Sequence, residues 1–250
     1  MRDEIIYGIN PVLEALRADR QTLNKVMIAQ GKEGASFYTL RHLAREKGIP
    51  VHVHPKDVLN KLAGTEHHQG VLGVLASSPY STWEDLLKKV QLAQGHAVVL
   101  ILDSIEDPQN LGSLIRTAEA CGAQGMILPR DRAVGITPAV VKASAGAVAH
   151  LPVVRVTNLA NTLEELKKEG FWIMGADPRG DQNLYEMKFD MNIGVVIGSE
   201  GKGIRPLVLK KCDYRITIPM KGKVSSLNAA IAGAVILFEI LRQKLLRTTS

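Results

Sequence analysis

Apolar residues along the chain follow two different spacings. Short continuous runs, such as AVVLIL at 97–102 and IGVVIG at 193–198, predict buried strands. Stretches whose apolar residues recur every three or four positions, such as SFYTLRHLAREKG at 36–48, predict amphipathic helices. Continuous apolar strands separated by helices are typical of a parallel sheet that is covered on both faces. The pattern therefore predicts an α/β protein.

The alternation of helix and strand runs through the chain twice. Residues 1–76 carry a first set of short strands and helices, which predicts a small α/β domain. Residues 77–96, SSPYSTWEDLLKKVQLAQGH, open on serine and proline before a short amphipathic helix, and we interpret them as a linker. The strand pattern restarts at 97, so residues 97–250 are predicted to form a second, larger domain.

Composition narrows the class of protein. The 250 residues are enough to bury a core without disulfides, and the two cysteines, Cys121 and Cys212, lack the spacing of a zinc site. We therefore expect a reducing compartment and no metal. No uninterrupted apolar run reaches membrane-spanning length, which predicts a cytoplasmic protein with no membrane partner. Lys and Arg exceed Asp and Glu by 31 − 25 = 6, a balance that favours an anionic partner such as nucleic acid.

Ligands of open parallel sheets bind at the carboxyl ends of the strands, so the residues that follow each strand are of interest. After AVVLILD comes SIEDPQNLGSLIRTAEACG, in which Asp107-Pro108 is a helix-start signal and Asn110 is a second possible N-cap. Arg116 lies off the apolar stripe of this helix. The alternative interpretation makes Arg116 a surface residue and Asn110 a cap.

Two further strand ends carry unusual residues. After IGVVIG comes SEGKGI, where Glu200 sits in a glycine-rich turn that matches neither a Walker loop nor G-x-G-x-x-G. A tight turn needing positive φ is the alternative interpretation. After YRITI, the stretch PMKGKVSSLNAA opens a strongly apolar helix on Ser225, Ser226 and Asn228. We expect one serine to cap that helix, which leaves Ser226 and Asn228 for another role.

The three stretches together are more specific than any one of them. D-x-x-x-D-P-x-N-x-G-x-x-x-R-T-A, I-G-S-E-G-x-G-I and I-P-M-x-G-x-x-x-S-L-N occur in order, each after a strand. This set resembles the three motifs of the SpoU (TrmH) family of RNA ribose 2′-O-methyltransferases. The N-terminal stretches IYGINPVLEAL and HHQGV resemble the small substrate-binding domain of the RlmB branch, which methylates a guanosine ribose of large-subunit (23S) ribosomal RNA.

The resemblance implies a fold that periodicity alone does not predict. In this family the parallel sheet of the C-terminal domain carries a deep trefoil knot, and the protein forms a homodimer through that domain. The methyl donor is S-adenosylmethionine, held in the loops of the knot. Carried over by motif, the residues implied to bind it are Ala176, Gly198, Ile218, Met220 and Leu227. Those implied to form the catalytic centre are Asn110, Arg116, Glu200, Ser226 and Asn228.

The chemistry that follows from the resemblance concerns a weak nucleophile. A ribose hydroxyl must lose its proton, or its developing alkoxide must be stabilised. A guanidinium is a poor base because its pKa exceeds about 12, so we favour Arg116 as an electrostatic clamp on the hydroxyl and a nearby phosphate. A direct role of Arg116 in proton removal stays open. Asn110 and Glu200 would orient Arg116 and the ribose, and this scheme needs no metal.

Other functions are weighed against this one. A transfer RNA could be the substrate instead of ribosomal RNA, or the scaffold could bind RNA without catalysis. A nucleotide-binding oxidoreductase should show G-x-G-x-x-G after its first strand, and the sequence lacks it there. His52, His54 and the pair His67-His68 could bind a metal, but no further cysteine or histidine completes a ligand set. Surface or RNA-facing histidines are the simpler interpretation.

Overall fold

A computed structural model describes residues 5–18, 23–75, 80–93 and 95–248. The chain forms two compact units, each described here by itself. The first comprises Met1–Pro79 with Gly135–His150, and the second comprises Tyr80–Val134 with Leu151–Ser250. Part of the predicted linker, at 77–79 and 94, lies outside the described residues. No helix in the described ranges is long and apolar enough to cross a membrane.

The first unit is a four-stranded sheet with helices. Its strands have the order β1-β4-β2-β3, in which only β2 and β3 pair in parallel. Helices α1 and α2 pack on each other, and α3 covers a core of Met27, Ala29, Leu59, Leu72 and Val74. The elements are β1 Ile5–Tyr7, α1 Ile9–Arg17, β2 Leu23–Ala29, α2 Ala35–Glu46, β3 Val51–His54, α3 Lys56–Ala63 and β4 Val71–Leu75.

A segment far along the chain completes this unit. It contains α6 (Pro138–Ala143) and a 3₁₀ turn, η1 (Ala147–Ala149), and α6 contacts β1. Glu14 Oε2 and His150 Nε2 lie 2.8 Å apart. Burial would raise the pKa of Glu14, but the hydrogen bonds and charges of His150 and Arg17 outweigh it and hold this pKa below its usual value. The contact ties α1 to the distant segment.

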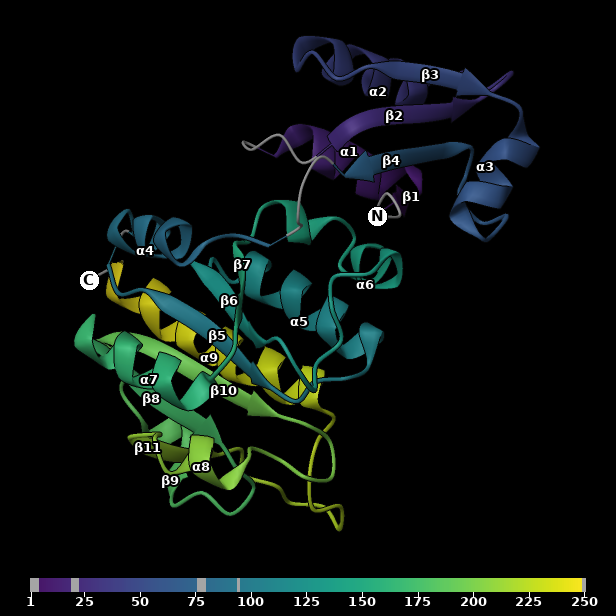
Figure 1. The fold of residues 1–250 in the computed structure, drawn as a ribbon. Coiled ribbons are helices and arrows are strands. Elements are labelled where there is room, and N and C mark those ends of the chain that lie inside the picture. Colours follow the sequence, from purple (N-terminus) through teal and green to yellow (C-terminus); the bar gives the residue numbers. More distant parts are fainter. Residues whose placement is uncertain (1–4, 19–22, 76–79, 94, 249–250) are drawn as a thin grey trace. The chain divides into compact units, whose positions relative to one another are not determined.

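The second unit confirms the parallel α/β prediction. Its seven-stranded sheet has the order β7-β6-β5-β10-β8-β11-β9, and all its pairings are parallel. Figure 1 shows the sheet between helices. Its strands are β5 Val98–Asp103, β6 Gly125–Pro129, β7 Val153–Val156, β8 Phe171–Ala176, β9 Gln182–Asn183, β10 Asn192–Gly198 and β11 Tyr214–Thr217. Its helices are α4 Trp83–Gln91, α5 Pro108–Ala120, α7 Leu159–Lys168, α8 Pro206–Leu209 and α9 Ala229–Thr248, with a 3₁₀ turn η2 at Leu184–Glu186.

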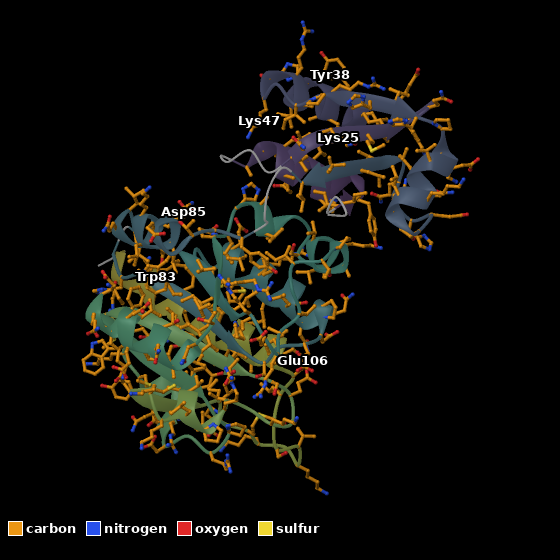
Figure 2. All side chains as sticks on the ribbon, viewed as in Figure 1. Lys25, Tyr38, Lys47, Trp83, Asp85 and Glu106 are labelled. Carbon is orange, nitrogen blue, oxygen red and sulfur yellow. The ribbon has the colours of Figure 1, made fainter. Side chains whose placement is uncertain are left out.

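Helices cover both faces of this sheet. On one face, buried residues of α4, α7 and α8 pack on alternate residues of the central strands, including Ile101, Ile173 and Val196. On the other face α5 and α9 pack on each other and on β6 and β10. Helix α4, marked by Trp83 and Asp85 in Figure 2, lies in the predicted linker. It has a full capping box at Thr82, and its Leu86 is fully buried in this core.

Candidate active site

Loops at the carboxyl ends of three parallel strands form a cleft of about 930 Å³, called the main cleft here. The loops follow β10, β8 and β11, which are consecutive strands in the sheet. Such a position is where open α/β sheets bind ligands. All five residues that the family resemblance assigns to the donor line this cleft, namely Ala176, Gly198, Ile218, Met220 and Leu227.

Three of the predicted catalytic residues form one hydrogen-bonded cluster. Asn110 Nδ2 donates to Glu200 Oε1 over 2.8 Å, and Asn228 Nδ2 donates to Asn110 Oδ1 over 3.0 Å. Asn228 Nδ2 also donates to Glu200 Oε1. Glu200 and Asn228 line the main cleft, so the cluster stands at its wall. These residues come from three separate loops or helix starts and lie up to 118 positions apart in the sequence.

Helix capping explains how the two asparagines are held. At α5 the cap is Asp107, whose Oδ2 accepts from the backbone N–H of Asn110, so the Asn110 side chain is left to reach Glu200. At α9 the expectation of a serine cap is wrong. Asn228 Oδ1 accepts from the backbone N–H groups of Ala230 and Ile231, at 2.9 and 3.2 Å. The side-chain oxygen of Asn228 thus caps the helix, while its side-chain N–H₂ donates to Asn110 and Glu200.

The glycine-rich turn around Glu200 is fixed by close backbone packing. A Cβ on Gly198 would lie 2.1 Å from the carbonyl carbon of Gly203, so only glycine fits. Ser199 and Gly203 exchange two backbone hydrogen bonds, at 3.2 and 2.8 Å. Gly201 and Gly203 have φ of +80° and +67°, as the tight-turn interpretation requires. Backbone geometry thus explains why these positions are glycine, and Glu200 lies at the tip of the turn that they form.

Two residues to which the motifs assigned no role, Asp103 and Arg205, lock this turn in place. Asp103, at the end of β5, is fully buried and pairs in the sheet with Gly198. Its Oδ2 accepts from the backbone N–H of Arg205 over 2.8 Å, and its Oδ1 accepts from Arg205 Nε over 2.6 Å. The signal was present in AVVLILD, because a charge closing an apolar strand has to find a partner once it is buried.

A smaller cleft of about 640 Å³, called the side cleft here, adjoins the main cleft. The two share Ser199, Glu200, Lys202 and Gly203. Asn110, Arg132 and Arg205 also line the side cleft. The cluster around Glu200 therefore faces both spaces.

The two remaining predicted catalytic residues differ in their placement. Ser226 is exposed and lines the main cleft. Arg116 lies on α5, is exposed, and lines neither cleft. It has no hydrogen bond or ion pair with any residue that the structure describes. The structure thus brings Asn110, Glu200 and Asn228 together and places Ser226 in the lining of the main cleft with Glu200 and Asn228. Arg116 stands six residues beyond Asn110 on the same helix.

The histidines considered as metal ligands do not gather. His52 and His54 lie on the edge strand β3, with ring centroids 6.2 Å apart. His68 is fully buried, and its two ring nitrogens bond Asn60 Oδ1 and the backbone N–H of Gly70. Burial, followed by the charges of Lys56 and Lys32, lowers its pKa below the usual value. No cluster of three or more His, Cys, Asp or Glu suited to a metal occurs among the described residues.

Two family models match the chain. The model described as the SpoU rRNA methylase family matches residues 97–238. The model described as RNA 2′-O ribose methyltransferase substrate binding matches residues 5–81. Between them the two matches span the main cleft, the side cleft and the four-stranded sheet.

Known proteins resemble the chain, and the first two named here do so over nearly its whole length. A TrmH family tRNA/rRNA methyltransferase of Bacillus subtilis, YacO, is 42% identical and is aligned over 96% of both chains. The SpoU methyltransferase AviRb from Streptomyces viridochromogenes, solved in complex with AdoMet, is 26% identical with a TM-score of 0.81, over 98% of this chain and 92% of its own. A structure described by the 2-OH methylation of C/U34 on tRNA is 32% identical with a TM-score of 0.56, over 61% of this chain and 99% of its own.

Proposed function

The chain belongs to the SpoU rRNA methylase family of RNA methyltransferases, and we propose that it methylates the ribose 2′-hydroxyl of a guanosine in large-subunit (23S) ribosomal RNA. The observation that carries this proposal is the hydrogen-bonded cluster of Asn110, Glu200 and Asn228 in the wall of the main cleft. The guanosine and the ribosomal RNA rest on the resemblance to the RlmB branch.

S-adenosylmethionine is the methyl donor, and the main cleft fits it. Its volume of about 930 Å³ lies within the roughly 300–1,000 Å³ of small-molecule sites. Its wall joins apolar side chains, Ile218 and Leu227 among them, to strand ends with small residues, Ala176 and Gly198, where a ligand can approach the backbone. When bound, the donor supplies an electrophilic methyl group on a sulfonium.

The residues of the chain would act on the ribose hydroxyl. Holding the hydroxyl in attack geometry can supply about 7–11 kcal/mol of the barrier. Glu200 offers a carboxylate oxygen, Oε1, that two asparagine amides already orient, and Ser226 lies along the same cleft. We assign Arg116 to stabilise the developing negative charge or an adjacent phosphate. At 1.5 Å per residue it lies about 9 Å along α5 from Asn110, within reach of an extended nucleotide.

The first unit is assigned to RNA recognition. It matches the substrate-binding family model, and the cluster described above lies in the second unit. Since Gly135–His150 packs in the first unit, a deletion of residues 1–76 would strip that segment of its partners. Experiments on RNA binding should therefore use the intact chain with surface substitutions.

We also assign a homodimer through the second unit, as the family resemblance implies. Support comes from α9, where Ile231, Phe238 and Leu245 are 54%, 53% and 59% exposed at a spacing of seven residues. These residues share one helix face, because seven residues make nearly two turns. A second copy of the chain would bury this stripe. Light scattering should give a dimer for the protein and a monomer for Phe238→Glu.

The trefoil knot is likewise a proposal. Strand β9 belongs to the connection from β8 to β10, yet in the sheet it lies beyond β11, at the edge. The connection therefore runs out past the place of β11 and returns to β10. After β11 the chain returns to α9, which packs on α5 and β10. This order of strands suits a chain end that is threaded through a loop. Tracing the closed chain for its knot type tests the proposal directly.

Transfer RNA is the second candidate substrate, because relatives carry names or titles with tRNA. The test is to map 2′-O-methyl groups on all RNA from cells with and without the gene, and to repeat the transfer in vitro with labelled donor. Loss of one 23S guanosine methyl group is expected. Loss of a methyl group from a transfer RNA would instead identify transfer RNA as the substrate. If RNA from cells without the gene carries the same 2′-O-methyl groups, and the protein still binds RNA, the protein is catalytically silent.

A further inference from the structure

The side cleft contains three cations that the mechanism above does not use, Arg132, Lys202 and Arg205. Arg132 and Lys202 are exposed, and neither has an ion pair or hydrogen bond within the described part of the chain. Arg132 also adopts φ of +57°, which is uncommon for a residue with a side chain. These cations stand beside Asn110 and Glu200, which we place at the ribose.

Arg205 differs from the other two because a buried carboxylate anchors it. Asp103, which is fully buried, bonds both the backbone N–H and the Nε of Arg205, whose side chain is 37% exposed. The terminal guanidinium nitrogens have no partner among the described residues. An anchored guanidinium with a free outer edge suits the oxygens of a phosphate, because little side-chain freedom is lost on binding.

Three carboxylates also line this cleft, and two of them accept hydrogen bonds from neutral groups, which hold their side chains but do not cancel their charge. Asp107 accepts from the backbone of Asn110, and Glu200 accepts from the two asparagine amides. Glu106, labelled in Figure 2 on the loop between β5 and α5, has no partner within the described ranges. An anion in the cleft would therefore be attracted by Arg132, Lys202 and Arg205 and repelled by Glu106, Asp107 and Glu200, and Glu106 is the one of these carboxylates with no hydrogen-bond partner among the described residues.

We propose that the side cleft binds a backbone phosphate of the RNA next to the methylated ribose, with Arg205 as the anchored contact and Arg132 and Lys202 beside it. Asp103 is then a positioning residue, which acts through Arg205. The inference rests on the proposed function, because it takes the ribose to lie at Asn110 and Glu200. It adds a charged subsite that fixes the nucleotide flanking the reaction centre.

The test measures how RNA affinity depends on salt. Each phosphate contact with single-stranded nucleic acid contributes a slope of about −0.7 to log K against log[NaCl]. Arg132→Gln is the primary variant, because Arg132 is exposed and lines only the side cleft. We expect it to weaken binding of a 23S RNA transcript and to reduce the slope by about 0.7. Lys210→Gln, an exposed cation that lines neither cleft, is the matched control and should change neither quantity.

Two further variants separate an electrostatic effect from a structural one. Glu106→Gln should strengthen RNA binding, opposite in sign to Arg132→Gln, because a repulsive charge is removed. Arg205→Lys keeps the charge but loses the fork, and it should weaken RNA binding while calorimetry shows unchanged donor affinity. An unchanged salt slope in Arg132→Gln, or a Glu106→Gln that weakens binding, would overturn the proposal.

The proposed function can fail separately. Transfer of a labelled methyl group to RNA by the unaltered protein tests that function without any variant. If the unaltered protein methylates RNA and the salt slope of Arg132→Gln is unchanged, only the phosphate subsite is wrong. If no RNA accepts a methyl group, the proposed function is wrong, and the ribose loses its assigned place beside this cleft.

Discussion

Asn110 and Glu200 lie 90 positions apart in the sequence, yet Asn110 Nδ2 donates to Glu200 Oε1 over 2.8 Å. The bond joins the start of α5 to the tip of the glycine-rich turn after β10. Both residues stand in the wall of the side cleft, and Glu200 also faces the main cleft. The contact therefore fixes a carboxylate at the point where the donor and the RNA are proposed to meet.

The negative charge of Glu200 should contribute more to the rate of methyl transfer than the hydrogen bonds that its side chain accepts. Glu200→Gln keeps an oxygen that accepts from both asparagine amides but removes the negative charge. We expect single-turnover methyl transfer to fall about 10²-fold, with a melting temperature close to that of the unaltered protein. Glu119→Gln, an exposed carboxylate on α5, is the control and should keep its rate. A Glu200→Gln protein with a normal rate would confine Glu200 to holding the turn.

Arg116 should be needed for catalysis and not for folding. It is exposed and has no partner among the described residues, so Arg116→Ala should change the free energy of unfolding by less than about 0.5 kcal/mol. Loss of a transition-state clamp should lower single-turnover methyl transfer about 10²–10³-fold. Arg116→Lys should not restore the rate fully, because an ammonium cannot form a bidentate fork. A folded, donor-binding Arg116→Ala protein with a near-normal rate would make Arg116 a surface residue.

The two roles of Asn228 can be separated. Asn228→Ala removes the cap of α9 and the cluster amide, and it should cost about 1 kcal/mol in unfolding free energy as well as activity. Asn228→Ser keeps a capping oxygen but lacks the amide N–H₂. Chemical denaturation should find the serine variant nearly as stable as the unaltered protein, while single-turnover assays find both variants slow. Full activity in the serine variant would argue against a catalytic role of the amide.

Acid should destabilise the first unit through His68. Because burial lowers its pKa in the folded state, the unfolded chain takes up a proton first, near the ordinary value of 6.5. The stability from neutral His68 is thus complete above pH 6.5 and is lost as pH falls below it. Glu14, whose pKa is also lowered, adds a separate loss only below its ordinary value of 4.5.

NMR titration checks the His68 prediction. Its ring signal should titrate with a midpoint below 6.5, and it can be identified by its absence from the spectrum of His68→Gln. His67→Gln removes the exposed neighbour and should leave that signal in place. A His68 midpoint at or above 6.5 would contradict the buried, neutral ring bonded to Asn60 and Gly70.

The two thiols should be unreactive in the folded protein. Burial raises the pKa of Cys121 to about 11 and that of Cys212 to about 12. Because the thiolate is the reactive form, iodoacetamide at pH 7.5 should alkylate both slowly, and denaturant should speed the reaction. Rapid labelling of either cysteine before unfolding, detected by mass spectrometry, would contradict this.

Local sequence patterns determined the elements of this protein. The apolar runs at 97–102 and 193–198 correspond to β5 and β10, and Asp107-Pro108 marks the start of α5. These three predictions are correct because a buried strand or a helix cap depends on residues that are close together in the chain. The resemblance also named residues that now line the main cleft, and their roles stay predictions.

Tertiary structure decided the pairings between distant segments. Gly135–His150 lies within the catalytic family match but packs with the first unit, where His150 meets Glu14. No periodicity encodes such a contact, because its energy comes from partners 136 positions apart.

The N-cap of α9 shows the same division. From the sequence we expected a serine to cap this helix and left Ser226 and Asn228 for another role. Asn228 takes the position because its carbonyl can cap Ala230 and Ile231 while its amide reaches Asn110 and Glu200. Likewise, Asp103 was visible as an acid at a strand end, but only the folded chain brings Arg205 to it. The sequence by itself determined which residues could serve, and the folded chain decided which do, because a buried polar group is stable only where its partner lies within bonding distance.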